Sequence, residues 1–236
     1  MRLFVALLLA GAPAWCAIAF DNSADLGNNG GSTSSYTTAN YTVGAGSNMA
    51  LVIDLTGDTA SDNITGVTWN GNALTLINKR QGTRWNYAYI LLNAPSGTGT
   101  VTVTAGTAHY LIVVAASYSG VGSVDNNGTF TSATSPVSAS LTPIANNCWV
   151  LATTWSFSSV VASTNTLVRQ RDTAFASDAV VESSLNPISP AASTTLTWTY
   201  SAGQTASGVI FSLAPSGGGG GGGAVLHQLL TLGVGK

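Results

Sequence analysis

The hydrophobic and polar positions of this chain alternate with a period of two over most of its length. Val101 and Val103 alternate with threonines in TVTVT, and Leu196, Trp198 and Tyr200 alternate with threonines in TTLTWTY. Successive side chains of a strand point to opposite faces, so this pattern predicts strands with a core-facing side and a hydroxyl-bearing side. No window outside the N-terminal segment keeps a 3.6-residue period, which indicates an all-β protein.

Turn residues separate the predicted strands. Asn70-Gly71 lies between ITGVTW and ALTLI, and this pair is the strongest short hairpin signal because a type I′ turn needs two positive φ angles. The other runs that read as strands are 48–55, 86–93, 100–105, 110–118, 137–141, 148–157, 166–171, 178–183, 194–200 and 208–213.

The second half of the chain repeats the strand pattern of the first. ALTLINKR parallels NTLVRQR, which pairs Arg80 with Arg171, and TVGAGSNMALVI parallels TPIANNCWVLAT. AFDNS also parallels SVDNN, and HYLIVVAASYSG parallels ASGVIFSLAPS. We therefore expect two tandem, internally duplicated β-sandwich repeats of Ig-like or jelly-roll type, 20–119 and 120–215, packed together. The second repeat lacks a clear counterpart of ITGVTWNG, and the pattern leaves open whether the repeats form two separate sandwiches or one fused sandwich.

These motifs resemble a β-sandwich module that recurs in bacterial secreted and surface proteins and in tailed-phage virion proteins. The similarity is carried by ITGVTWNGNALTLI, by PSGTGTVTVT and by the closing GVIFSLAP, and it covers most of residues 18–215. The resemblance implies display on a cell or particle surface, with structural or adhesive roles, and it supplies no catalytic residues to transfer.

The two ends differ from the body of the chain. Residues 1–19 begin with an Arg and an apolar run, followed by the A-x-A pattern of Ala17 and Ala19, which predicts a signal peptide or an N-terminal apolar segment. Residues 216–236 contain seven consecutive glycines and then AVLHQLLTLGVGK. This composition predicts a flexible tether that ends in an apolar segment, which could pair with a neighbouring molecule, dock on its own domain, or remain a disordered tail.

Composition narrows the class of function. Only 7% of the 236 residues are charged, the formal net charge is −2, and 45% of the residues are hydrophobic. This balance gives no electrostatic basis for binding nucleic acid and fits a secreted, extracellular or virion protein with Thr, Ser and Asn on its surface.

The sequence contains no recognisable catalytic motif. It shows no G-x-S-x-G elbow, no zinc-ligand spacing and no phosphate-binding loop, so we expect no enzyme and no cofactor. Asp178 and Glu182 lie four residues apart on one predicted strand, which separates their Cα atoms by about 13 Å, too far for a retaining glycosidase pair unless the strand bends, so a glycan-active enzyme is the remaining alternative. Cys148 lies in the apolar run NCWVLATTW and is expected to be a core residue, although a disulfide with Cys16 is open if the leader is retained.

Three groups of residues are candidates for binding. Calcium is possible at Asp54, Asp58 and Asp62, which lie in one oxygen-rich segment, and an ordinary loop is the alternative. A partner with negative charge is possible at a basic group that comprises Lys79, Arg80, Arg84, Arg169 and Arg171, and the alternative is a solvated strand end with local ion pairs such as Arg171 with Asp178.

The third candidate is an aromatic row for carbohydrate. Trp85, Tyr87 and Tyr89 lie on one strand face, where aromatic rings could stack on a sugar or fill a core. Together these patterns predict a non-enzymatic display, attachment or decoration protein. Its partner would be a glycan or a cell or virion surface, or further copies of itself in a homo-oligomer. A carbohydrate-binding module and a filament subunit that assembles through its C-terminal tail are the alternatives.

Overall fold

The computed structural model describes residues 17–57, 61–156, 160–164, 166–174, 177–200 and 205–217. For 160–162, 171, 173–174 and 177–182 it describes the backbone alone. These residues form an all-β protein of four antiparallel sheets. Within the described ranges we find no helix of the length and apolarity needed to span a bilayer.

Seventeen strands form the sheets. The first half contains β1 (Ala19–Asn28), β2 (Thr33–Val43), β3 (Ala50–Gly57), β4 (Ile64–Trp69), β5 (Asn72–Ala73), β6 (Thr75–Gln81), β7 (Trp85–Leu92), β8 (Gly97–His109) and β9 (Leu111–Ser119). The second half contains β10 (Val121–Ser132), β11 (Val137–Leu141), β12 (Trp149–Ser156), β13 (Val160–Thr164), β14 (Thr166–Ala174), β15 (Ser177–Ser184), β16 (Thr194–Tyr200) and β17 (Ala206–Pro215).

The two halves have the same strand order. Inner sheet 1 has the order β1-β9-β3-β7-β6 and inner sheet 2 has the order β10-β17-β12-β15-β14. Outer sheet 1 has the order β2-β8-β4-β5, and outer sheet 2 has the order β11-β16-β13. Each strand of the second half therefore takes the place of one strand of the first, except that no described strand corresponds to β5.

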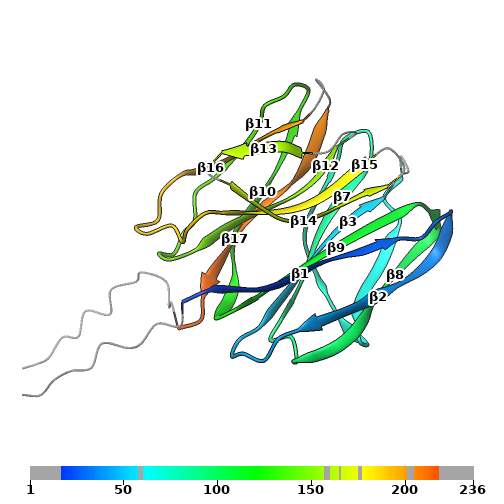
Figure 1. Ribbon diagram of the computed structural model, residues 1–236, viewed down its shortest axis with the longest axis horizontal. Helices are drawn as coiled ribbons and strands as arrows, with labels where there is room; N and C mark the ends of the chain where they lie inside the picture. The colour runs from blue at the N-terminus through cyan, green and yellow to red at the C-terminus, as the bar shows by residue number, and fades with distance from the viewer. Residues whose placement is uncertain are drawn as a thin grey trace, which may run out of the picture.

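The four sheets stack as layers (Figure 1), and a hydrophobic core lies between each pair of neighbouring sheets. The first core joins the two sheets of the first half, and the third core joins those of the second half. The second core lies between the two inner sheets and includes Val52, Val114, Leu151 and Phe211. Of the two arrangements that the sequence left open, the chain adopts one fused four-layer sandwich in which the central strands β3, β9, β12 and β17 of the inner sheets are buried on both faces.

Burial on both faces explains the continuous apolar runs of the central strands. On β3, Leu51 and Ile53 belong to the first core, whereas Ala50 and Val52 belong to the core between the inner sheets. The outer strands have only one buried face and therefore alternate. Val101, Val103, Leu196 and Trp198 are all fully buried, which confirms the face assignment made from their spacing.

Strand pairing also relates the two halves in detail. β6 has a bulge between Leu76 and Asn78 against β7, and β14 has one between Val168 and Gln170 against β15. In inner sheet 1, Tyr87 of β7 pairs with Lys79 of β6 on one side and with Leu55 of β3 on the other. In inner sheet 2, Val180 of β15 pairs in the same way with Arg171 of β14 and with Thr154 of β12. Arg171 thus corresponds to Lys79. The T-L-x-x-x-R pattern aligns Arg171 with Arg80 instead, and this alignment is wrong by one residue because a sequence pattern does not contain the register of the strands.

Turn and capping residues recur at matching places. Asn70 and Gly71 have φ of 47° and 81°, as the predicted type I′ hairpin requires. The side chain of Asp21 accepts hydrogen bonds from the Gly44 N–H (2.9 Å) and the Ser117 hydroxyl (2.6 Å). The side chain of Asp125 accepts them from the Ile144 N–H (2.6 Å) and the Ser212 hydroxyl (3.0 Å), so the D-N motif anchors the first strand of each half.

The junction with the expected leader lies inside the folded body. Ile18 is 4% exposed and belongs to the core between the inner sheets, and Ala19 pairs with Ser119 as the first residue of β1. Cleavage after Ala19 would therefore remove one core side chain. Residues 1–16, with Cys16, lie outside the described part of the chain.

Candidate functional site

The five basic residues of the predicted patch do not share one surface. Lys79, Arg80 and Arg84 lie on or just after β6, and Arg169 and Arg171 lie on β14. β6 packs beside β10 and β17, whereas β14 packs beside β1 and β9. The two groups thus occupy opposite edges of the contact between the inner sheets, and the hypothesis that all five residues form one anionic-partner patch is wrong.

Local contacts engage several of these cations. Lys79 forms an ion pair with Asp62 and lies 5.7 Å from the Trp85 ring centroid. Arg80 Nε donates a 2.8 Å hydrogen bond to the Thr131 hydroxyl on β10. The sequence could not show Asp62 and Thr131 as partners, because they lie 17 and 51 residues away along the chain.

The aromatic row belongs to the first core. Tyr87 and Tyr89 are 2% and 6% exposed, and their ring centroids are 6.3 Å apart. Burial, followed by the charge of Asp62, raises the pKa of Tyr89 to about 12. Trp85 remains partly buried at the end of the row. Two of the three rings have no free face, so of the two uses that the sequence left open, core packing and sugar stacking, the structure shows core packing for Tyr87 and Tyr89.

The carboxylates proposed for calcium point away from each other. Asp54 is fully buried between the inner sheets and accepts a 2.6 Å hydrogen bond from the Asn86 amide. Asp62 accepts hydrogen bonds from Lys79 and from the Tyr87 hydroxyl on the opposite face of inner sheet 1. Asp58 lies outside the described residues, and those that are described contain no cluster of three or more His, Cys, Asp or Glu suited to a metal ion. Asp54 and Asp62 therefore do not form the joint site that their spacing suggested.

Cys148 is a buried core thiol. Its Sγ donates to the Ala145 carbonyl at 3.1 Å, and burial raises its pKa to about 12. Such a thiol is almost entirely protonated near neutral pH and is a poor nucleophile, as expected from its apolar context.

The outer sheets present a different kind of surface. Cross-strand hydroxyl pairs connect Thr42 to Thr98 (2.8 Å) and Thr37 to Thr102 (3.3 Å) on outer sheet 1. On outer sheet 2 the corresponding pairs are Ser140 to Thr195 (2.7 Å) and Ser138 to Thr197 (3.2 Å). None of the outer strands that the structure describes contains Asp, Glu, Lys or Arg. Both outer faces are thus uncharged and lined with hydroxyl groups.

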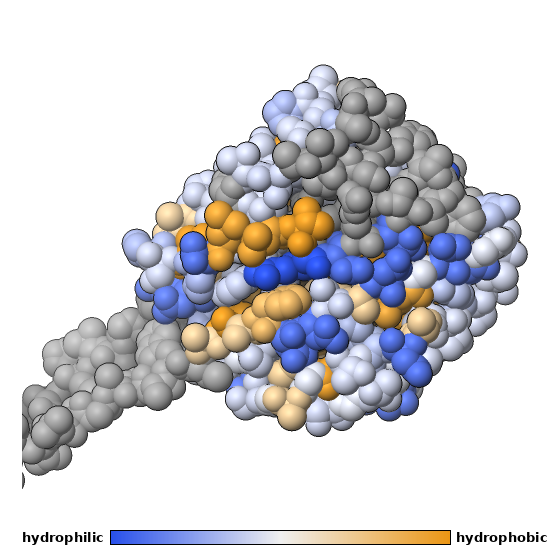
Figure 2. Space-filling model, in the orientation of Figure 1, coloured by the Kyte–Doolittle hydropathy of each residue, from blue (hydrophilic) through white to orange (hydrophobic). Residues whose placement is uncertain are grey.

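Figure 2 shows how this surface differs from the contact between the halves. Much of the surface over β2 and β8 is pale, the colour of intermediate hydropathy, whereas strongly apolar and strongly hydrophilic residues lie side by side along the line where β1 meets β14. The alternation of threonines in the sequence predicted hydroxyl-bearing strand faces. It did not show that these faces lie on opposite sides of one folded body.

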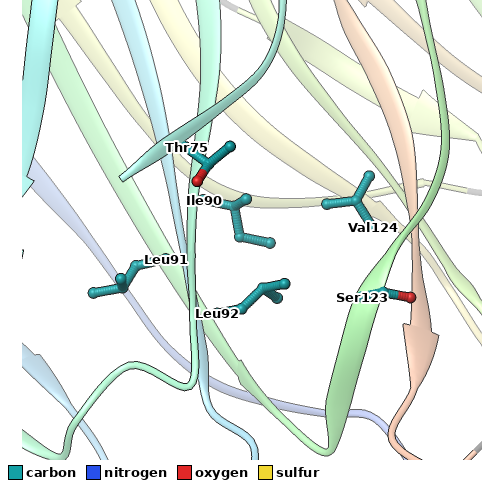
Figure 3. A pocket seen from close by; sticks show the side chains of 6 residues that line it. All are labelled: Thr75, Ile90, Leu91, Leu92, Ser123 and Val124. Atoms are coloured by element: carbon teal, nitrogen blue, oxygen red, sulfur yellow. The ribbon is translucent and has the colours of Figure 1, made fainter. Parts of the chain in front are cut away.

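A pocket of about 420 Å³ lies at the other edge of the contact between the halves, between β7 and β10. Its lining residues are Thr75, Ile90, Leu91, Leu92, Ser123 and Val124. Figure 3 shows Ile90 and Leu92 pointing from β7 toward Val124 on β10. Sequence reasoning did not find this pocket, because its walls come from different halves and their packing is not visible in a local pattern.

In comparisons with known proteins, no family model, no curated protein and no solved structure matches the chain.

Proposed function

We propose that this chain is a non-enzymatic display or attachment protein of a cell or virion surface, and that its uncharged outer faces contact a neutral, hydroxyl-rich polymer. The observation that carries the proposal is the pair of hydroxyl-lined faces on opposite sides of one four-layer body. Such a body offers two contact surfaces and holds them at a fixed separation.

The chemistry of these faces selects the class of partner. Threonine side chains on one strand face repeat about every 6.7 Å, and neighbouring strands lie about 4.8 Å apart. A hydroxyl group both donates and accepts hydrogen bonds, as do the hydroxyls of a polysaccharide. Without charged side chains on these strands, attraction to the polymer would depend little on ionic strength.

Retention on insoluble neutral polysaccharide tests the proposal. We expect the full chain to be retained by at least one member of a panel that includes cellulose and chitin, with similar retention at 50 mM and 500 mM salt. A variant that combines Thr37→Lys and Thr102→Lys on outer sheet 1 with Ser138→Lys and Thr197→Lys on outer sheet 2 places bulky charges on both faces and should lower the bound fraction about tenfold.

A lysine at an inner-sheet position provides the matched control. Thr129 is exposed on β10, away from the outer faces, so Thr129→Lys should bind as the unmodified chain does. Absence of retention by the whole panel, or equal retention of the outer-face and control variants, would contradict the proposal.

A further inference from the structure

The contact between the inner sheets has two edges that the common strand order makes equivalent. At one edge β14 packs beside β1, and at the other β6 packs beside β10. The strand pairings place Phe20 of β1 and Val124 of β10 at matching positions, opposite Tyr118 and Leu213. The two edges can therefore be compared residue by residue.

Large side chains fill the β1–β14 edge. The Arg169 guanidinium lies 4.5 Å from the Phe20 ring centroid and 5.1 Å from that of Trp149. Arg169 Nε also donates a 2.7 Å hydrogen bond to the Ser183 hydroxyl. This stack occupies the space between the two inner sheets at that edge.

Smaller side chains occupy the matching positions at the β6–β10 edge. Val124 replaces Phe20, Ala50 replaces Trp149 and the bulge residue Ile77 replaces Arg169, as the pairings of these strands show. The loss of two aromatic rings leaves the pocket lined by Ile90, Leu92 and Val124 (Figure 3). Its volume of about 420 Å³ falls in the range of pockets that bind ligands.

The chain leaves the folded body beside this pocket. The Ser216 N–H donates a 2.7 Å hydrogen bond to the Gly120 carbonyl, and a Cβ built on Gly122 would lie 3.0 Å from the Pro215 carbonyl oxygen. The next residue, Ser123, pairs with Ala214 and lines the pocket. Gly217 is the last described residue, and the remaining glycines of the run follow it.

We propose that the pocket between β7 and β10 is the docking site of the C-terminal segment 224–232 of the same chain. This segment, AVLHQLLTL, supplies four leucines and no charged residue, which matches the aliphatic lining of the pocket. Glycine-rich chains of seven residues span about 13–16 Å on average, so a run of this length is sufficient to connect the exit point with the pocket. A tether this short also gives an effective concentration in the millimolar range, which favours the same chain over a neighbour.

Disulfide trapping in the full chain tests this docking. In a Cys16→Ser background, Ser123→Cys is combined with Leu229→Cys, and mild oxidation should give an intrachain disulfide in monomeric protein, read by non-reducing electrophoresis and peptide mass spectrometry. The matched control replaces Ser123→Cys with Ala19→Cys. Ala19 pairs with Ser119 near the same exit point but belongs to the filled edge, so its yield should be at least tenfold lower.

A second variant separates docking from chance encounter. Val124→Phe introduces into the pocket an aromatic ring like the one that Phe20 supplies at the other edge. It should lower the yield of the disulfide between the cysteines at 123 and 229 about tenfold. Circular dichroism should remain that of a β protein. Equal yields at Ser123 and Ala19, exclusively interchain disulfides, or an unchanged yield with Val124→Phe would each overturn the proposal.

Discussion

The side chain of Arg169 packs against residues of both halves of the protein. Its guanidinium lies over both Phe20 of the first half and Trp149 of the second, and the Ser23 hydroxyl donates a 2.8 Å hydrogen bond to its carbonyl oxygen. A cation held over two ring faces and partly shielded from water contributes more than an exposed one. The sequence indicated a binding patch at this residue, whereas the structure places it in a contact within the protein.

We predict that Arg169→Ala lowers the free energy of unfolding by about 1–2 kcal/mol, because it removes two cation–π contacts and one side-chain hydrogen bond. Urea titration followed by tryptophan fluorescence measures the change. Arg169→Lys should recover only part of the loss, since an ammonium group cannot stack as the planar guanidinium does.

Arg80→Ala is the control for this prediction. Arg80 is exposed and its Nε donates to the Thr131 hydroxyl, so the expected loss is below about 0.5 kcal/mol. Equal losses for Arg169→Ala and Arg80→Ala would contradict the role given to the ring contacts.

At the scale of strands, alternation predicted where the strands lie, but it did not show which of them pack against another sheet on both faces. The outer strands have one buried face, so the spacing of Val101 and Val103 fixed their orientation. The aromatic row on β7 also alternates, but each face of an inner strand packs on another sheet, and periodicity cannot tell a core from an exposed face there. The spacing of Tyr87 and Tyr89 therefore left both sugar stacking and core packing open, and the structure shows that they are core residues.

Gly208 permits the close approach of β17 to β12. A Cβ at this position would lie 2.0 Å from the Thr153 carbonyl oxygen and 2.7 Å from the Phe130 ring, which itself packs edge-to-face on Trp198. We predict that Gly208→Ala destabilises the protein by about 3 kcal/mol, because the strand and the ring must both move.

Gly128→Ala is the matched control on the paired strand β10, because its nearest neighbour to a Cβ is Ile210 at 3.8 Å. Thermal unfolding should show a small change for Gly128→Ala and a large fall in melting temperature for Gly208→Ala. Comparable effects of the two variants would rule out the steric explanation.

At the scale of the molecule, the core between the inner sheets makes the two halves mutually dependent. Phe211 of the second half and Val52 of the first half both belong to this core. Two buried hydrogen bonds lie beside it: the Thr153 hydroxyl donates to Asn86 (2.9 Å), and the Asn86 amide donates to Asp54 (2.6 Å). Separate halves would expose this apolar layer and leave its polar groups without partners from the other half. The repeated sequence pattern predicted two sandwiches packed together, but it could not show that their contact is a full core.

We predict that both halves unfold in one cooperative transition, with equal calorimetric and van't Hoff enthalpies. Phe211→Ala, which truncates a fully buried ring in the shared core, should destabilise this single transition by about 3–5 kcal/mol. Hydrogen exchange should lose protection to the same extent in β3 and in β12, although Phe211 lies in the second half. If the halves were independent domains, calorimetry would resolve two transitions, and Phe211→Ala would leave the protection of β3 unchanged.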